Sequence, residues 1–372
     1  MVFSVLLFKT GIQNQNASSR WLSFLLFLCS LYITPYMLGY TGWYTYSAAT
    51  TEFLFFIPFM QVLVIGPVVY FYIKCLLNPN FRFSKNDWIH FIPGLIYLIY
   101  SLVVFITDKY ILDEFYFYED NRDKDLKAWY QLSGLVSMLF YLVLSLKYYF
   151  NYKKLIFDTV SYAESILFRW IQNFLNAFLL FVIIRCVFFF TNPQWENFGS
   201  QFWYFLAFSF IMFYMAISGY THAIRSSTVG PVIAKAHSTV DEIEPKQNST
   251  PQLDQWHNKI IELLEVKKAY TNPRLTLLDV ANELNTTTKT VSGIINSRFH
   301  MNFNDLINHY RIEAVKDKLK NGEHQQSTLL GIALESGFNS KATFNRAFKK
   351  NTRITPKGFI QTLSKNRSQI KI

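Results

Sequence analysis

The chain has 372 residues, of which 51% are hydrophobic and 18% aromatic, and its formal net charge is +11. The apolar share is too high for an ordinary soluble domain, and the basic excess favours an anionic partner such as nucleic acid or an anionic membrane surface. The three cysteines have no CxxC partner, so they imply neither a zinc site nor a disulfide framework and are expected to be small buried hydrophobes. The apolar runs and the basic excess lie in different parts of the chain. Nearly all long apolar runs lie in residues 1–224, whereas residues 253–372 hold 19 Lys and Arg against 10 Asp and Glu.

Six apolar segments in the first part are each about the 20 residues that a membrane-spanning helix needs. They cover residues 21–40, 53–73, 88–107, 128–146, 170–191 and 201–224. Five carry no charged side chain, and the fifth carries only Arg185. We expect a polytopic helix bundle of six spans, or seven if the short apolar stretch 1–8 ends a longer span that starts upstream.

The basic residues of the connections predict the orientation of these spans, because Lys and Arg collect on the cytoplasmic side. Connections 74–87 and 147–169 are basic, connections 41–52 and 192–200 have no Lys or Arg, and connection 108–127 has seven acidic residues against four basic ones. This pattern places the N-terminus and residues 225–372 in the cytoplasm and the spans in a bacterial inner membrane.

Ionisable side chains are sparse in the predicted spans, and no catalytic residue, metal ligand or cofactor site is expected. Arg185 is close enough to the outer end of its span to extend its guanidinium toward the interface. His90 has no second His or carboxylate three or four residues on, and we expect a hydrogen-bonded residue near the cytoplasmic face.

Residues 225–255 are predicted to be a flexible linker, since Ser, Thr, Gly and Pro interrupt the apolar periodicity. The domains are therefore a membrane domain at 1–224, this linker, a soluble α-helical domain at 256–366 and a basic tail at 367–372.

The soluble domain begins with an amphipathic helix that we expect to end near Tyr270. Thr276 and Asp279 have the spacing of a capping box, which predicts a short helix over 277–284 that breaks at Asn285. Thr287 is a good N-cap for the next helix. Two short helices joined by a short polar turn predict a helix-turn-helix.

A second such unit follows. Ser327 is expected to cap its first helix, Gly337 to provide the left-handed turn position, and Asn339 to cap its second helix, which runs to Lys350. Residues 303–320 between the two units predict one connecting helix about 26 Å long.

These motifs resemble the C-terminal domain of the AraC/XylS family of transcription regulators over residues 257–366. The resemblance is carried by Leu278-x-Val280-Ala281, Tyr310-Arg311-Ile312-Glu313-Ala314, Ile332-Ala333-x-x-x-Gly337-Phe338, Phe344-x-Arg346-x-Phe348-Lys349-Lys350 and Thr355-Pro356. Less specific motifs, Gly66-Pro67 and Asp87-x-x-His90-Phe91-x-Pro93, are similar to the multi-helix sensor portion of a membrane-bound branch of that family.

The resemblance implies which side chains face DNA. The expected DNA-binding residues are Lys289, Ser292 and Asn296 in the first unit, and Lys341, Ala342, Asn345, Arg346, Lys349 and Lys350 in the second. Arg346 is able to bond a guanine bidentately and Asn345 an adenine, whereas Lys349 and Lys350 suit phosphates. A solvated helix face is the alternative explanation for each charged residue.

Two positions depart from the family pattern. Gly293 stands where a reading side chain is usual, so the first unit is expected to add less specificity. Arg353 replaces the usual glycine before Ile354-Thr355-Pro356, which is expected to strain or reshape that turn.

The sequence therefore predicts a membrane-embedded one-component transcription regulator, not an enzyme, controlled by a signal sensed in the membrane domain. Double-stranded promoter DNA and the lipid bilayer are the expected partners, with RNA polymerase, a second copy of the chain and an unidentified signal ligand as further candidates. One alternative is a transporter or membrane enzyme with an appended DNA-binding domain. Another is a membrane tether whose DNA contact is non-specific, which would show steep salt dependence and little sequence preference.

Overall fold

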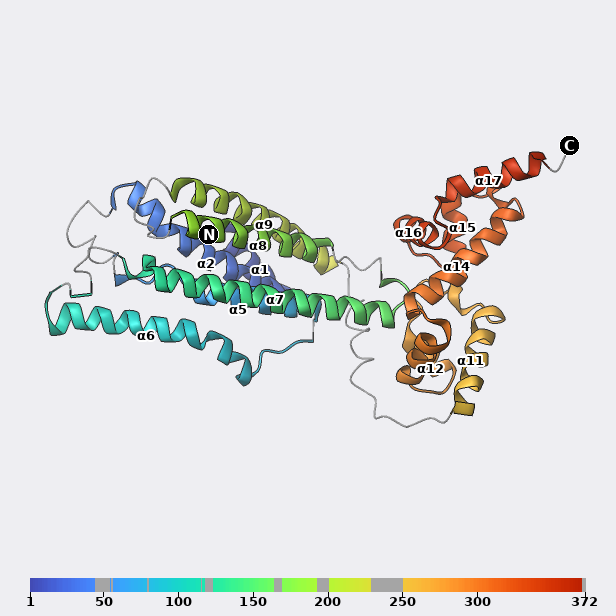
Figure 1. Ribbon diagram of the computed structural model, residues 1–372, viewed down its shortest axis with the longest axis horizontal. Coiled ribbons are helices and arrows are strands. Elements are labelled where there is room, and N and C mark those ends of the chain that lie inside the picture. The colour runs from blue at the N-terminus through green and yellow to red at the C-terminus, as the bar shows by residue number, and fades with distance from the viewer. Residues whose placement is uncertain are drawn as a thin grey trace. The chain divides into compact units, whose positions relative to one another are not determined.

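The computed structural model describes residues 1–43, 54, 56–78, 80–114, 116–117, 123–163, 169–192, 201–228 and 250–369. Most of the predicted linker, at 229–249, and the end of the basic tail, at 370–372, lie outside these residues. The chain divides into two compact bodies (Figure 1). The N-terminal body comprises residues 1–150 and 168–233, and the C-terminal body comprises residues 151–167 and 234–372.

The fold is all-α, as predicted, and in the described ranges the β-pairing is one isolated antiparallel bridge, between Val160 and Thr276. The N-terminal body contains α1 (Val2–Gln13), α2 (Ala17–Tyr40), α5 (Val62–Leu77), α6 (Ile92–Ile106), α7 (Ala128–Thr159), α8 (Arg169–Thr191) and α9 (Phe202–Thr228). Short helical turns η1 (Lys85–Phe91), η2 (Thr107–Ile111) and η3 (Lys124–Leu126) join some of them. The last residues of α7 belong to the C-terminal body.

Five helices of the described chain are long and apolar enough to cross a membrane, one fewer than the sequence predicted. They are Ala17–Tyr40, Lys85–Ile111, Ala128–Thr159, Arg169–Thr191 and Phe202–Ile224. The expected span at 53–73 is not one continuous helix, because residues 57–61 are irregular and α5 starts only at Val62, with 16 residues. Pro58 explains the break, since proline has no N–H and disfavours a helical conformation in the residue before it.

Buried polar side chains satisfy the irregular backbone before α5. The Met60 amide donates to Asp125 Oδ2 (2.9 Å), and the Met60 carbonyl accepts from the Tyr130 hydroxyl (2.6 Å). Lys124 Nζ donates to the carbonyl of Phe56 (3.4 Å). Non-helical backbone among apolar helices needs such internal partners. The end of the acidic connection 108–127 is thus buried in the protein, and burial raises the pKa of Asp125.

Arg185 does not extend to the interface as expected. Its side chain is 1% exposed, donates to the hydroxyl of Tyr32, and donates to Gln131 Oε1 at 2.7 Å. These neutral oxygens offset part of the cost of burying the charge. His90 does form a hydrogen bond near the end of its helix, between Nδ1 and the hydroxyl of Tyr141 (2.9 Å), as predicted.

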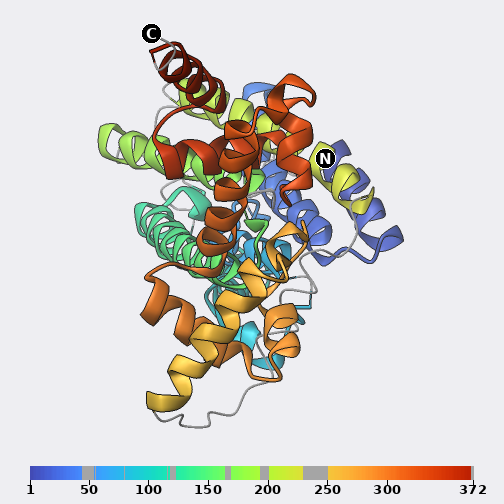
Figure 2. The same ribbon diagram turned by 90° about the vertical axis from the view of Figure 1, so that its right-hand side faces the viewer.

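The C-terminal body has two helical groups at opposite ends of the long helix α14 (Figures 1 and 2). The first group is α11 (Thr250–Glu265), η6 (Ala269–Thr271), α12 (Leu277–Glu283), α13 (Thr288–Ile294) and η7 (Ile295–Phe299). Then come α14 (Phe303–Lys320), η8 (Glu323–Gln325), α15 (Leu329–Glu335), α16 (Lys341–Thr352) and α17 (Pro356–Gln369). The first helix ends at Glu265, earlier than predicted, and α9 and α11 both extend into the predicted linker.

Each helical group has its own apolar core, and α14 contributes to both. Leu306 and Ile307 pack into the first core, with residues from α11, α12 and α13. Ile312, Val315 and Leu319 pack into the second core, with residues from α15 and α16. Because one helix enters both cores, it holds the two groups at a set spacing.

Candidate DNA-binding surface

The first helix-turn-helix unit, α12 and α13, is built from the local signals that the sequence showed. Thr276 and Asp279 form the predicted capping box, with the Thr276 amide donating to Asp279 Oδ2 (2.9 Å) and the Asp279 amide donating to Thr276 Oγ1 (3.2 Å). The turn between the helices has Asn285 in a left-handed conformation, at φ 51°. Thr287 then caps α13 by accepting from the amide of Thr290 (3.1 Å), as predicted.

The expected reading residues of this unit share one side of α13 and its extension. Lys289 and Asn296 are exposed and Ser292 is half-buried, and Asn296 Nδ2 lies 3.4 Å from Ser292 Oγ. Positions 289, 292 and 296 are three and four residues apart, which places them on one helix face. Asn296 lies in the π-helical turn η7 rather than in α13 itself, so the regular part of this reading helix is only seven residues long.

The second unit, α15 and α16, starts each helix one residue later than the predicted caps. Thr328, not Ser327, caps α15 by accepting from the Gly331 amide (3.0 Å). Ser340, not Asn339, caps α16 by accepting from the Thr343 amide (3.2 Å). The predicted and observed residues at each helix start are all good cap types, so residue type alone does not choose between them.

The two faces of α16 differ sharply. Phe344 and Phe348 are buried, at 1% and 0% exposure, and anchor the helix in the second core. The expected DNA-facing residues lie on the other side and are all exposed: Lys341, Ala342, Asn345, Arg346, Lys349 and Lys350. Arg346 therefore points away from the core, as its place between the two phenylalanines predicted.

The exposed face of α16 lies in the most basic part of the chain. The chain from Lys341 onward contains nine basic and no acidic residues. Lys350 on α16 forms an ion pair with Asp305 on α14, with its Nζ 2.6 Å from Asp305 Oδ1. Such an exposed pair is worth little, so a phosphate could replace Asp305 at small cost. Arg353 follows α16 in a left-handed conformation, at φ 62°, so arginine here adopts the backbone conformation that glycine favours.

The two units meet at Arg311, in the middle of α14. Its Nε donates to the carbonyl of Tyr270 in the first group (2.8 Å), and its guanidinium carbon lies 5.8 Å from the ring centroid of Phe338 in the second. Gly337 has φ 95°, and a Cβ there would lie 2.2 Å from the Tyr270 carbonyl oxygen. Only glycine allows the turn of the second unit to approach the first group this closely.

Sequence reasoning missed one part of this arrangement. Residues Val160–Ala163, which directly follow α7, are buried, pair with Leu275 and Thr276 just before α12, and contact α14, where Ser161 accepts hydrogen bonds from Arg311. The motif around Arg311 was visible in the sequence, but nothing in it indicated a partner 150 residues earlier.

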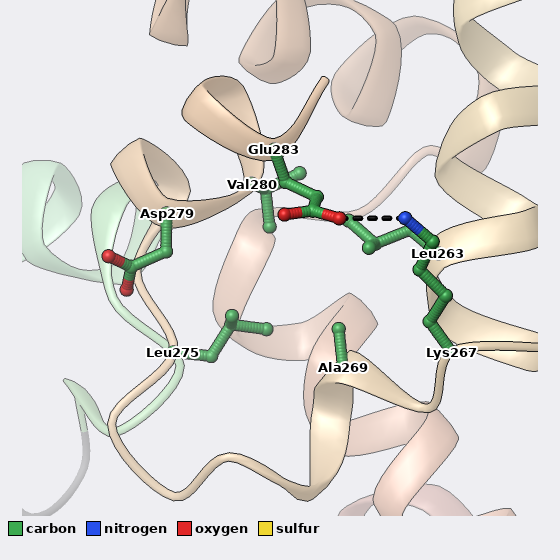
Figure 3. A pocket seen from close by; sticks show the side chains of 7 residues that line it. All are labelled: Leu263, Lys267, Ala269, Leu275, Asp279, Val280 and Glu283. Atoms are coloured by element: carbon green, nitrogen blue, oxygen red, sulfur yellow. Dashed lines mark hydrogen bonds and ion pairs between the residues drawn. The ribbon is translucent and has the colours of Figure 1, made fainter. Parts of the chain in front are cut away.

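A shallow pocket also lies in the first group, between α11 and α12 (Figure 3). Its volume is about 270 Å³, and its lining is mostly apolar, from Leu263, Ala269, Leu275 and Val280. The polar side chains at its rim already have partners, because Lys267 pairs with Glu283 (2.7 Å) and Asp279 completes the capping box. We therefore assign this pocket to the packing of the two helices.

A family model described as a helix-turn-helix domain, of the AraC type, matches residues 280–362. The match begins within α12, includes all of α14 and both reading helices, and ends in α17. Searches among curated proteins and among solved structures find no match. Residues 280–362 thus form an AraC-type helix-turn-helix domain, and the chain that carries them is a DNA-binding transcription regulator.

Proposed function

We propose that this protein is a membrane-embedded one-component regulator that reads promoter DNA through α13 and α16 in adjacent major grooves. The observation that carries the proposal is the exposed polar face of α16, set by buried Phe344 and Phe348 within the matched domain. The 18 residues of α14 give a connector about 27 Å long. That length suits two reading helices on groove faces about 34 Å apart.

The side chains at the proposed contact divide into two classes. Arg346 and Asn345 have planar groups with paired hydrogen-bonding atoms, which suit guanine and adenine edges respectively. Lys341 and Lys349 are flexible point charges that suit phosphates, which position the protein but do not specify sequence. In the first unit, Lys289, Ser292 and Asn296 offer one charge and two small polar groups. We therefore propose that the second unit supplies most of the sequence preference.

Selection from random DNA duplexes by the full-length chain in lipid nanodiscs tests sequence-specific reading. The expected result is an enriched site with two conserved blocks one helical turn apart, the stronger block belonging to α16. Binding to that site should also be far tighter than binding to unrelated duplexes at the same salt concentration. Equal binding to all duplexes, with a steep loss of affinity as salt rises, would instead identify a non-specific membrane tether.

Membrane embedding is supported by the apolar surface of the N-terminal body. Large hydrophobic side chains are more than half exposed along several of its helices, among them Leu102 on α6, Val143 on α7 and Phe210 on α9. Apolar faces of this extent need a lipid covering. Together with the basic connections, this supports a bacterial inner-membrane location with the C-terminal body in the cytoplasm.

Reporter fusions test that topology. A fluorescent protein fused after residue 372 should be fluorescent, whereas alkaline phosphatase fused there should be inactive because it folds only outside the cytoplasm. Active phosphatase at that position would place the DNA-binding domain on the wrong side of the membrane and overturn the proposal.

Signal sensing by the N-terminal body is proposed because that body is much larger than a tether requires. The alternative of a transporter is suggested by three buried charged residues, because transporters use buried carboxylates. These residues are Asp123, Lys124 and Asp125. Here, however, Asp125 and Lys124 hold the irregular backbone before α5. Because Asp125 and Lys124 have this structural role, they do not support the transporter alternative, and we favour the sensor. We also propose RNA polymerase and a second copy of the chain as partners.

A further inference from the structure

Four consecutive residues after α7, Val160–Ala163, are buried in the C-terminal body. Their exposures are 1% for Val160, 0% for Ser161, 6% for Tyr162 and 0% for Ala163. A connection between two apolar helices would ordinarily be exposed to water. Residues 160–163, which we call the docking segment, are instead packed as an integral part of the DNA-binding domain.

Backbone pairing holds the docking segment at the start of the first helix-turn-helix unit. Val160 and Thr276 form an antiparallel bridge, and the Ser161 amide donates to the carbonyl of Leu275 (3.1 Å). Asn304 at the start of α14 donates from Nδ2 to the carbonyl of Val160 (3.3 Å). The segment therefore contacts both α14 and the residues that begin α12. Figure 3 shows this green stretch of chain passing beside the loop that carries Leu275.

Arg311 depends on the docking segment for two of its hydrogen-bond acceptors. Its Nη1 donates to the carbonyl of Ser161 (3.2 Å), and its Nη2 donates to Ser161 Oγ (3.1 Å). The remaining acceptors belong to the domain itself: the carbonyls of Tyr270 and Asn272 and Oδ1 of Asn308. All five acceptors are neutral, and burial lowers the pKa of Arg311 to about 9, so the group stays charged at neutral pH.

A buried charge is costly when its hydrogen bonds are removed. Undocking would leave Arg311 with fewer acceptors at the position where it contacts Tyr270 of the first helical group on one side and Phe338 of the second helix-turn-helix unit on the other. The docked segment therefore orders the junction that sets the relative placement of α13 and α16. It does so while the reading residues Lys289 and Arg346 stay exposed.

We propose that docking of residues 160–163 at Arg311 is the switch of this regulator, and that the docked state is the one that binds both major grooves together. The inference rests on the proposed function and names how it is regulated. Undocking leaves α16 able to bind its own half-site but loosens the packing of the first group on α14, so that α13 no longer keeps the orientation that the full site requires. The segment acts on the junction, not on the DNA contacts.

In this proposal a signal reaches the docking segment through α7, the helix that precedes it. α7 is 32 residues long, which is about 48 Å, and the docking segment follows its last residue directly. Near its other end, Gln131 accepts from Arg185 and donates to the carbonyl of Asp125 (2.5 Å). A signal that rearranges the contacts of Gln131 acts on the same helix whose end carries the docking segment.

A charge placed in the docking segment tests the switch. Val160→Asp places a carboxylate at a position that is 1% exposed and should undock the segment, whereas Asn151→Asp adds the same charge at an exposed position of α7. Both variants are prepared as full-length protein in nanodiscs and titrated with the selected two-groove site and with the α16 half-site alone. Val160→Asp should lose at least about tenfold in affinity for the full site, as expected when two linked modules cease to act together.

The half-site reports on folding, because Val160→Asp should bind it as the wild type does. Equal affinity of the two variants for the full site would overturn the proposal, and so would equal losses on both sites. The first result would show that docking is irrelevant, and the second that the variant is merely misfolded.

A cross-link tests docking without reference to DNA. Residues paired in an antiparallel bridge have Cα atoms about 4.5–5.5 Å apart, within the range of a disulfide. Val160→Cys combined with Thr276→Cys should form a disulfide on mild oxidation. The oxidised protein should bind the two-groove site at least as tightly as the reduced form of the same variant, a comparison that removes the effect of losing the Thr276 cap. Failure to cross-link, or loss of binding on cross-linking, would refute the switch. If the wild type shows no sequence-specific binding, the proposed function fails, and the cross-link still reports whether the segment docks.

Discussion

The two helix-turn-helix units share one layout but differ in what they offer to DNA. α13 has seven residues, carries Lys289, and has Gly293 exposed on its surface. α16 has 12 residues, with Arg346, Asn345 and several lysines opposite two buried phenylalanines. If both units contact DNA as proposed, their contributions should therefore differ. The second unit offers an arginine and an asparagine for base edges, whereas the first offers only Asn296 of these two residue types, and we expect it to add the weaker contact.

The largest effect is expected at Gly337, the turn residue of the second unit, which lies against the first helical group. Gly337→Ala places a side chain at φ 95°, where its Cβ would lie 2.2 Å from the Tyr270 carbonyl oxygen. Strain of a left-handed backbone alone costs about 1–3 kcal/mol, and the overlap adds to it. We expect a clear fall in the thermal midpoint of the C-terminal body, followed by intrinsic fluorescence of the full chain in nanodiscs. An unchanged midpoint would contradict the close approach at this junction.

Base reading by the second unit is expected to depend on Arg346. Arg346→Ala should cost about 1–3 kcal/mol on the preferred site and relax the preference at one base position. Lys349→Ala is the matched control on the same helix. It should weaken all sequences alike and reduce the salt dependence by about one unit of slope. A uniform loss in Arg346→Ala would show that arginine contacts only phosphate, and the contrast between the two units would then lose its basis.

Stability should rise when the residue after α16 is returned to glycine. Arg353 occupies a left-handed conformation at φ 62°, which glycine adopts without penalty. Arg353→Gly should stabilise the domain by about 1 kcal/mol. Arg353→Ala keeps the Cβ and should give no such gain, so an equal gain in both variants would show that the side chain, not the backbone, is responsible. The measurement is the thermal midpoint of each full-length variant.

The smallest effect is expected at the glycine of the first unit. A Cβ at Gly293 meets no atom within 4 Å, and the residue lies inside α13. Gly293→Ala should therefore stabilise the helix by about 0.5–1 kcal/mol, opposite in sign to Gly337→Ala. Reduced stability would mean that the surface of α13 is already covered, contrary to its assignment as a reading face.

Local signals in the sequence were enough to predict most of the DNA-binding domain. The capping box at Thr276, the turn at Gly337 and the connecting helix at 303–320 all follow from residue type and short-range spacing, and the structure has them. The predicted caps Ser327 and Asn339 were each one residue early, because the adjacent residues Thr328 and Ser340 are also good cap types and accept the capping hydrogen bonds instead. Residue type alone does not choose between two adjacent good caps.

Polar contacts between residues far apart in the chain could not be predicted from the sequence. Hydropathy treated residues 53–73 as one span, but Pro58 breaks it and Asp125, far along the chain, satisfies the freed backbone. Arg185 was expected near the interface because its partners Tyr32 and Gln131 are distant in sequence. The docking of Ser161 at Arg311 is of the same kind. The periodicity of a helix shows which side is buried, but not which side chain it meets.

The most direct test of the central claim is genome-wide mapping of DNA bound by the intact protein in its own cells, compared with the Arg346→Ala form. We expect discrete enriched sites that share a two-block sequence, with occupancy reduced in the variant and the block read by α16 most affected. No enriched sites, or identical occupancy for the wild type and the variant, would contradict the account of this protein as a sequence-reading regulator.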